Sequence, residues 1–152
     1  MQAKVDPDRD DADIIATPAA QTSAPPTRTV LYVEDNPSNM QLMRKLFARR
    51  RDIRPVYAHT PLLGIEMALA EKPDLVLLDI NLPGMNGREV LARLRSHPET
   101  AAVPIVAVTA NAMPGDVAQG IAAGFDAYVT KPIDISAFMQ AIDRWLALGA
   151  SM

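Results

Sequence analysis

From residue 28 onward, short apolar runs alternate along the chain with longer segments of helical periodicity. The apolar runs are bounded by turn residues, as buried strands are. Five strands are predicted, at residues 29–34, 53–58, 75–79, 103–109 and 126–130. Five helices are predicted between and after them, at residues 37–49, 61–71, 88–96, 114–123 and 135–148. The pattern is therefore strand–helix, repeated five times.

Strands that alternate with helices predict right-handed βαβ units and a parallel sheet covered on both faces, an α/β fold. The strands are near-continuous apolar runs, as a doubly covered sheet requires. Capping residues mark several helix starts: Asn36 before Pro37, Thr60 and Asp134. The segment 114–123 contains two glycines, so we expect it to be the least stable helix.

Residues 1–27 have a different composition from the rest of the chain. Five aspartates and several prolines lie among small residues, with Ile14 and Ile15 as the only large apolar pair. Such a segment buries too little apolar surface to offset its ordering entropy. We expect residues 1–27 to be a disordered tail or linker and residues 28–149 to form one domain, and a short docking segment around Ile14 remains the alternative.

Composition excludes several classes of protein. The 152 residues carry a net charge of −3 and a pI near 5.3, which argues against direct nucleic-acid binding by a basic surface. The absence of cysteine excludes disulfides and zinc–thiolate sites. No apolar run approaches the roughly 20 residues of a membrane helix, and the acidic N-terminus is unlike a signal peptide. We therefore expect a cytoplasmic protein without membrane insertion.

Chemically active side chains collect at the ends of the predicted strands. Glu34 and Asp35 follow the first strand, Asp79 ends the third, Thr109 ends the fourth and Lys131 follows the fifth. In a parallel sheet these ends share one rim, which is where ligands of open α/β sheets bind. Three acids and one ammonium on one rim suggest a divalent cation and a phosphoryl group.

The residue types suit phosphoryl transfer. Mg²⁺ prefers oxygen ligands, and carboxylates supply them. A carboxylate can also act as a nucleophile towards phosphorus, forming an aspartyl phosphate. The reaction then needs mainly positioning and charge neutralisation, which a cation and Lys131 could provide, with the Thr109 hydroxyl donating to a phosphoryl oxygen.

With these motifs in place, the chain resembles the receiver domains of two-component response regulators. The matching segments are Leu31–Asn36, Leu78–Gly87, Val108–Ala112 and Lys131-Pro132, and the resemblance covers residues 28–148. Each motif alone is modest, but four in order at successive strand ends are specific. The resemblance implies a flavodoxin-like doubly wound sheet of five parallel strands in the order 2-1-3-4-5 with five helices.

The resemblance also implies a role for each acid at the rim. Asp79 would be the phospho-acceptor, and Lys131 would pair with the phosphoryl group. Asp35 and Asp79 would bind Mg²⁺ (or Mn²⁺) with the backbone carbonyl of Asn81, and Glu34 would act through the ion's water shell.

Further positions would bind the phosphoryl group or respond to it. Thr109 and the backbone of Ala110 would bind phosphoryl oxygens, and Tyr128 would be the aromatic residue that turns inward with Thr109. Lys131-Pro132 would have a cis peptide bond. Asn111, with Asn81, would flank the path of attacking water.

The implied function is that of a phosphorylatable switch. A histidine kinase or histidine phosphotransfer protein would donate the phosphoryl group, and the face formed by residues 114–148 would control an unknown downstream protein. We expect no turnover of a separate substrate beyond autodephosphorylation. The chain could be a stand-alone regulator or the terminal receiver of a hybrid histidine kinase.

Two other function classes remain as alternatives. Haloacid dehalogenase-like phosphatases also use an aspartate nucleophile, but they place a paired Asp-x-Asp after the first strand, where this chain has Glu34-Asp35. A pseudo-receiver that only binds protein would not need the intact set of Asp79, Thr109 and Lys131.

Overall fold

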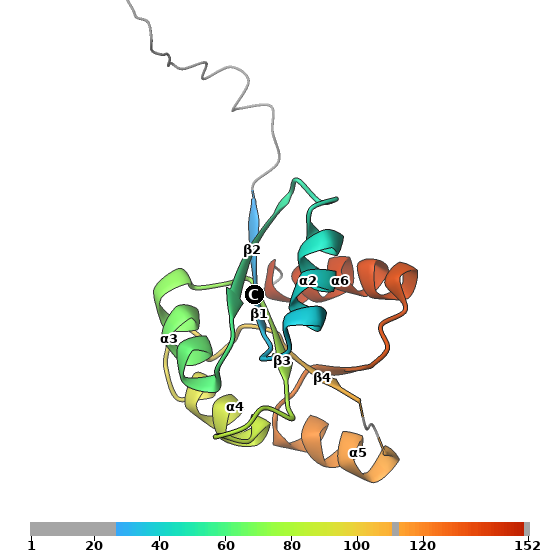
Figure 1. The fold of residues 1–152 in the computed structure, drawn as a ribbon. Coiled ribbons are helices and arrows are strands. Elements are labelled where there is room, and N and C mark those ends of the chain that lie inside the picture. Colours follow the sequence, from blue (N-terminus) through green and yellow to red (C-terminus); the bar gives the residue numbers. More distant parts are fainter. Residues whose placement is uncertain (1–26, 111–112, 151–152) are drawn as a thin grey trace, which may run out of the picture.

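The structure, a computed structural model, describes residues 27–110 and 113–150. These residues form five strands and five helices around one sheet (Figure 1). In chain order the elements are β1 (Arg28–Val33), α2 (Pro37–Phe47), β2 (Ile53–Ala58), α3 (Pro61–Glu71), β3 (Leu75–Asp79), α4 (Gly87–Arg95), β4 (Ile105–Thr109), α5 (Pro114–Ala123), β5 (Ala127–Thr130) and α6 (Ile135–Ala150). Among the described residues, no helix is long and apolar enough to span a bilayer.

The five strands form a single parallel sheet in the order β2-β1-β3-β4-β5, which confirms the predicted topology. The register aligns the carboxyl ends of the strands: Val33 lies opposite Ala58 and Leu78, and Thr109 lies opposite Thr130. Asp79 pairs with Val108, one residue before the end of β4. Residues that follow these strands therefore emerge at the same edge of the sheet.

Helices cover the sheet on both faces (Figure 1). On one face α2 and α6 pack against alternate strand residues, among them Tyr32 and Leu77. On the other face α3 and α4 pack against the intervening residues, among them Leu31 and Leu78. Every residue of β3 is buried because β3 is the central strand with helices on both sides. This explains why its sequence is apolar without alternation.

Side-chain caps fix the starts of four helices. Asn36 accepts hydrogen bonds from two backbone N–H groups of α2, and Thr60 accepts one from Leu63 of α3. Asp134 accepts one from Ala137 of α6. These three caps were predicted, whereas Asn86, which caps α4 through the Glu89 N–H, was not. The caps satisfy N–H groups that the first helical turn leaves unpaired.

The structure shortens two predicted elements by two residues each. β4 begins at Ile105 rather than residue 103, because Pro104 has no N–H for the ladder and contributes only its carbonyl, to Val76. α2 ends at Phe47 rather than residue 49, because the N–H groups of Arg49 and Arg50 bond three residues back and tighten the chain into a turn. The predicted tail and the predicted role of Asn111 lie outside the described residues.

Arg95 binds residues at the amino ends of the strands, on the side of the sheet away from the acidic cluster. From the last position of α4, its guanidinium donates to the carbonyl groups of Ala101, Val103 and Gly124 and to the carboxylate of Asp126. The same carboxylate accepts the N–H of the first residue of β4. One side chain thus joins α4, the start of β4, the end of α5 and the start of β5.

We expect Arg95→Ala to lower the free energy of unfolding by about 2 kcal/mol, because several carbonyl groups lose a charged donor. Arg93→Ala is the matched control, since Arg93 is exposed on the same helix and has only a 3.8 Å ion pair with Glu89. It should cost about 0.5 kcal/mol or less. Urea denaturation measures both, and equal losses would contradict the role given to Arg95.

Candidate functional site

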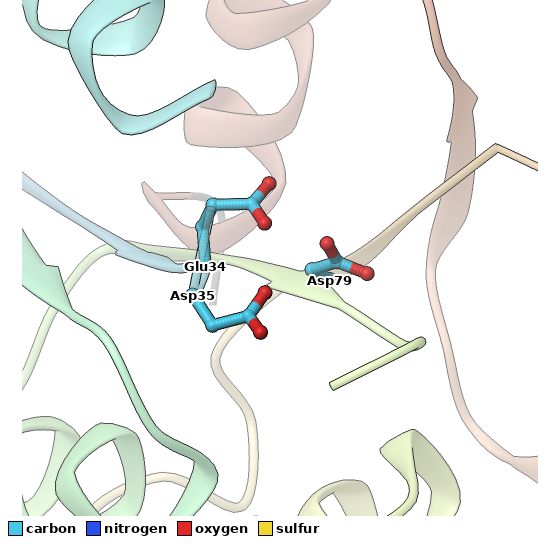
Figure 2. A group of neighbouring side chains, drawn as sticks. All are labelled: Glu34, Asp35 and Asp79. Atoms are coloured by element: carbon cyan, nitrogen blue, oxygen red, sulfur yellow. The ribbon is translucent and has the colours of Figure 1, made fainter. Parts of the chain in front are cut away.

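Three carboxylates meet where β1 and β3 end (Figure 2). Glu34 and Asp35 directly follow β1, and Asp79 is the last residue of β3, the neighbouring strand. One oxygen from each carboxylate lies within 4.8 Å of the others. Glu34 and Asp79 are buried, at 1% and 5% exposure, whereas Asp35 is exposed. The structure thus brings the predicted acids into a single cluster.

The Lys131 ammonium lies between the two buried carboxylates. Its Nζ donates to Glu34 Oε1 at 2.9 Å and to Asp79 Oδ2 at 2.8 Å. Lys131 follows β5, so this contact joins the edge of the sheet to its centre. Two buried carboxylates would be strongly unfavourable without a paired cation. Lys131 therefore allows both acids to lie inside the rim.

Glu34 is held by donors on three sides. Besides Lys131, it accepts the Tyr32 hydroxyl at 2.7 Å and the Asn36 N–H at 3.2 Å. Burial works to raise the pKa of Glu34, but the neighbouring Asp79, which takes up a proton more readily, and the hydrogen bonds from Lys131 and Tyr32 outweigh it and hold that pKa below its usual value. Glu34 is therefore a firmly ionised anchor.

Asp79 has fewer donors and a different electrostatic environment. Its Oδ1 accepts the Asn81 N–H at 2.9 Å, and its Oδ2 accepts the Lys131 ammonium at 2.8 Å, with no further donor among the described residues. Burial raises the pKa of Asp79, the nearby Glu34 adds to the rise, and Lys131 and the Asn81 N–H only partly offset it. For Lys131, burial works to lower the pKa, but the two carboxylates raise it above its usual value. The ammonium therefore stays charged.

Thr109 connects the cluster to the adjacent strand. The Asn81 side-chain amide donates to Thr109 Oγ1 at 3.1 Å, and the Lys131 N–H donates to the Thr109 carbonyl at 2.8 Å. Thr109 is fully buried, and Ala110 after it is exposed. The Lys131-Pro132 peptide bond is cis, as the resemblance implies. Thr109 thus contacts the residues that follow both β3 and β5.

Tyr128 lies behind Thr109 rather than in the acidic cluster. Both line a cavity of about 450 Å³ that is bounded by the loop after β3, the start of α4 and α5. The Tyr128 ring packs edge-to-face on Phe125, with 5.7 Å between centroids. Burial raises the pKa of its hydroxyl. This placement puts Tyr128 where a movement of Thr109 would change its surroundings.

The donor set fits a hard divalent cation. All the candidate ligands are oxygens, which Mg²⁺ and Mn²⁺ prefer. Within the described residues, the Asp35 carboxylate has no hydrogen bond or ion pair, and it points to the same space as Asp79 (Figure 2). The exposed Asp35 carboxylate could therefore bind an ion from solvent and hold it beside the buried Asp79 carboxylate.

A family of known proteins matches most of the chain. A family model described as the response regulator receiver domain matches residues 30–143. The chain belongs to the response regulator receiver domain family. It is thus a receiver domain of two-component signalling, a class of signalling modules, and the predicted family resemblance is confirmed.

The receiver is similar to named response regulators. The polar-differentiation response regulator DivK of Brucella ovis is 37% identical over 120 residues, which cover 79% of this chain and 97% of that protein. DivK of Brucella anthropi is 36% identical over 119 residues, covering 78% and 96%. The chain therefore spans nearly the full length of these relatives.

Solved structures agree with the fold. The receiver domain of the sensor histidine kinase PA1611 from Pseudomonas aeruginosa superposes with a TM-score of 0.72 at 28% identity. The match covers 80% of this chain and 98% of that one, and that structure has a magnesium ion in its active-site cleft. The chemotaxis response regulator CheY4 of Vibrio cholerae gives a TM-score of 0.72 at 22% identity, covering 78% and 98%. The latter likeness concerns the fold alone.

Two features of the site were not predicted from the sequence. The first is the hydrogen bond from Tyr32 to Glu34, and the second is the ion pair between Glu34 and Lys131. The first had a signal, because residues two apart on a strand point to the same face. The second had none, because 97 residues separate its partners.

We expect substitutions of the two buried acids to have opposite effects on stability. Glu34→Gln should lower the free energy of unfolding by about 2 kcal/mol at neutral pH, because a charged acceptor with three donors is lost. Asp79→Asn should raise the thermal midpoint, because its raised pKa means that the ionised form opposes folding. Thermal unfolding in metal-free buffer measures both.

The pH dependence of the Asp79→Asn effect has a definite sign. A carboxyl group with a raised folded-state pKa lowers stability as pH rises through that pKa. The gain from Asp79→Asn should therefore be present at neutral pH and disappear as pH falls below the ordinary carboxyl range. A gain that grows towards acid pH would contradict the described electrostatics.

Proposed function

We propose that this receiver accepts a phosphoryl group on Asp79 from the phosphohistidine of a histidine kinase or histidine phosphotransfer protein. The observation that carries the proposal is the position of Asp79, a buried carboxylate at the end of the central strand with a cation 2.8 Å away. A carboxylate oxygen attacks phosphorus as the bond from phosphorus to the imidazole nitrogen breaks. The bonding pair stays on the imidazole, which takes up a proton.

Asp79 is better suited to this role than Glu34. All the oxygens of Glu34 are committed to Tyr32, Asn36 and Lys131 inside the protein. Among the described residues, each oxygen of Asp79 accepts one donor, and Asp79 lies beside the exposed Asp35. A nucleophile needs a lone pair that is accessible to the donor, and Asp79 retains one.

The surrounding residues bind and neutralise the phosphoryl group. Lys131 provides positive charge, and the Thr109 hydroxyl and the Ala110 N–H bind phosphoryl oxygens. Asp35, Asp79 and the Asn81 carbonyl would hold Mg²⁺ or Mn²⁺, with Glu34 acting through water. When bound, the ion neutralises charge on the phosphoryl oxygens.

Switching follows from the contacts of Thr109. When Thr109 turns towards the phosphoryl group, the space behind it changes for Tyr128. The signal then passes to the face made by α5, β5 and α6, which controls a downstream partner. A phosphoryl group shifts the two states only as far as it contacts them differently, and Thr109 and Lys131 make that difference.

Phosphorylation tests the proposal directly. With Mg²⁺ and acetyl phosphate, the protein should gain one phosphoryl group that is stable to acid and labile to base, and chelator should abolish the gain. Asp79→Asn should show none. Asp134→Asn is a matched control, because it is exposed and an asparagine can keep the cap of α6. Intact-protein mass spectrometry measures the gain, and wild-type labelling of Asp79→Asn would contradict the assignment.

Lys131→Met should slow phosphoryl uptake by about tenfold or more, because a charge-assisted contact worth at least about 1.4 kcal/mol is removed. It should also reduce the conformational response. Single-turnover uptake from acetyl phosphate measures the rate, and circular dichroism checks that the variant is folded. Normal uptake and a normal response would remove the role given to Lys131.

A further inference from the structure

The Tyr128 side chain occupies a notch in α5 that exists because residue 120 is glycine. A Cβ atom on Gly120 would overlap the Tyr128 hydroxyl oxygen and lie 2.5 Å from ring atom Cζ and 2.6 Å from Cε1. Non-bonded carbon atoms are normally about 3.5–4.0 Å apart. The observed orientation of Tyr128 is therefore compatible with glycine alone at position 120.

The backbone of α5 does not itself require this glycine. Gly120 lies in the interior of the helix and is not in the left-handed region, unlike Gly124 at φ +125°. Interior helical glycine is less stable than alanine. Gly115 gives the comparison within the same helix, because a Cβ there would meet no atom within 4 Å. What Gly120 supplies is space for Tyr128.

This contact is also the main attachment of α5 to the domain. Gly120 is the one buried residue among the ten of α5. The helix contributes no residue to either of the two core clusters, whereas Phe125, which follows it, does. A hydrogen bond of 2.9 Å from Arg88 of α4 to Gln119 holds α5 beside the same notch. The seating of α5 therefore depends on the phenol that fills the notch.

We propose that Gly120 is a positioning residue that couples the orientation of Tyr128 to the position of α5 against β5. While the phenol occupies the notch, α5 is held against β5. When the phenol leaves, α5 loses its one buried contact. Tyr128 also lines the cavity with Thr109, so the notch joins the phosphoryl site to α5. The signalling consequence, although not the notch itself, rests on the proposed function.

The comparison of Gly120→Ala with Gly115→Ala tests the notch in the unphosphorylated protein. Labelling with 3-fluorotyrosine gives one ¹⁹F signal for each of the three tyrosines, and Tyr128→Phe identifies the signal of Tyr128. Gly120→Ala should shift this signal and abolish the NOE between the ring and the residue 120 α-proton. Gly115→Ala should leave both unchanged.

Thermal midpoints provide an independent readout. Gly115→Ala should raise the midpoint by about 2 °C, since Gly115 lies in the first turn of α5 and gains only part of the interior helix propensity, and Gly120→Ala should give no rise because the added methyl meets the ring. Tyr128→Leu removes the clashing ring atoms, so Gly120→Ala in that background should recover the rise. An unchanged Tyr128 signal in Gly120→Ala, or equal midpoints for the two alanine variants, would overturn the proposal.

The signalling arm uses Mg²⁺ and acetyl phosphate. Gly120→Ala should take up the phosphoryl group within twofold of the wild-type rate, because Gly120 does not line the acidic cluster, and the change in the Tyr128 signal should fall at least fivefold. A full Tyr128 change in this variant would overturn the coupling. If the wild type itself took up no phosphoryl group, the proposed function would fail, while the unphosphorylated comparison would still decide the notch.

Discussion

The rest of this site depends on the ion pairs that the Lys131 ammonium forms with Glu34 and Asp79. A parallel sheet brings the ends of its strands to one edge, and here those ends carry acids. Glu34 and Asp79 would repel each other in a buried space, and each would be unfavourable there alone. One cation from the end of β5 contacts both, at 2.9 and 2.8 Å. The fold can thus concentrate negative charge at its rim at a reduced cost in stability, although the ionised Asp79 still opposes folding.

The same cation acts on two acids that differ in their surroundings. Glu34 has donors from its own strand and the following turn, and its pKa is lowered. Asp79 shares the ammonium but has one other donor within the part of the chain that the structure describes, and its pKa is raised. Two neighbouring carboxylates thereby differ in their chemistry. Glu34 is structural, whereas Asp79 has fewer hydrogen-bond donors and is the more reactive group.

The fold could be predicted from the sequence because each strand of this sheet is visible there as a short apolar run. β3 is apolar throughout, and the helices begin at recognisable caps such as Asn36 and Thr60. The acids could be found for the same reason, since they follow those strands. Contacts between distant segments had no local signal: the donors of Arg95 reach carbonyl groups up to 29 residues away. The notch at Gly120 is likewise invisible in a sequence, where the glycine reads only as a weak helix former.

Arg95 has a mechanical consequence for α5. Its guanidinium holds the Gly124 carbonyl, at the C-terminal end of that helix, together with the start of β5. The N-terminal end of α5 has no side-chain cap at Met113, which is exposed. The described attachments of α5 therefore lie in its C-terminal half, at Gln119, Gly120 and Gly124, and no side-chain cap holds its start. A displacement of α5 should therefore be smallest near Gly124 and largest at its N-terminal end.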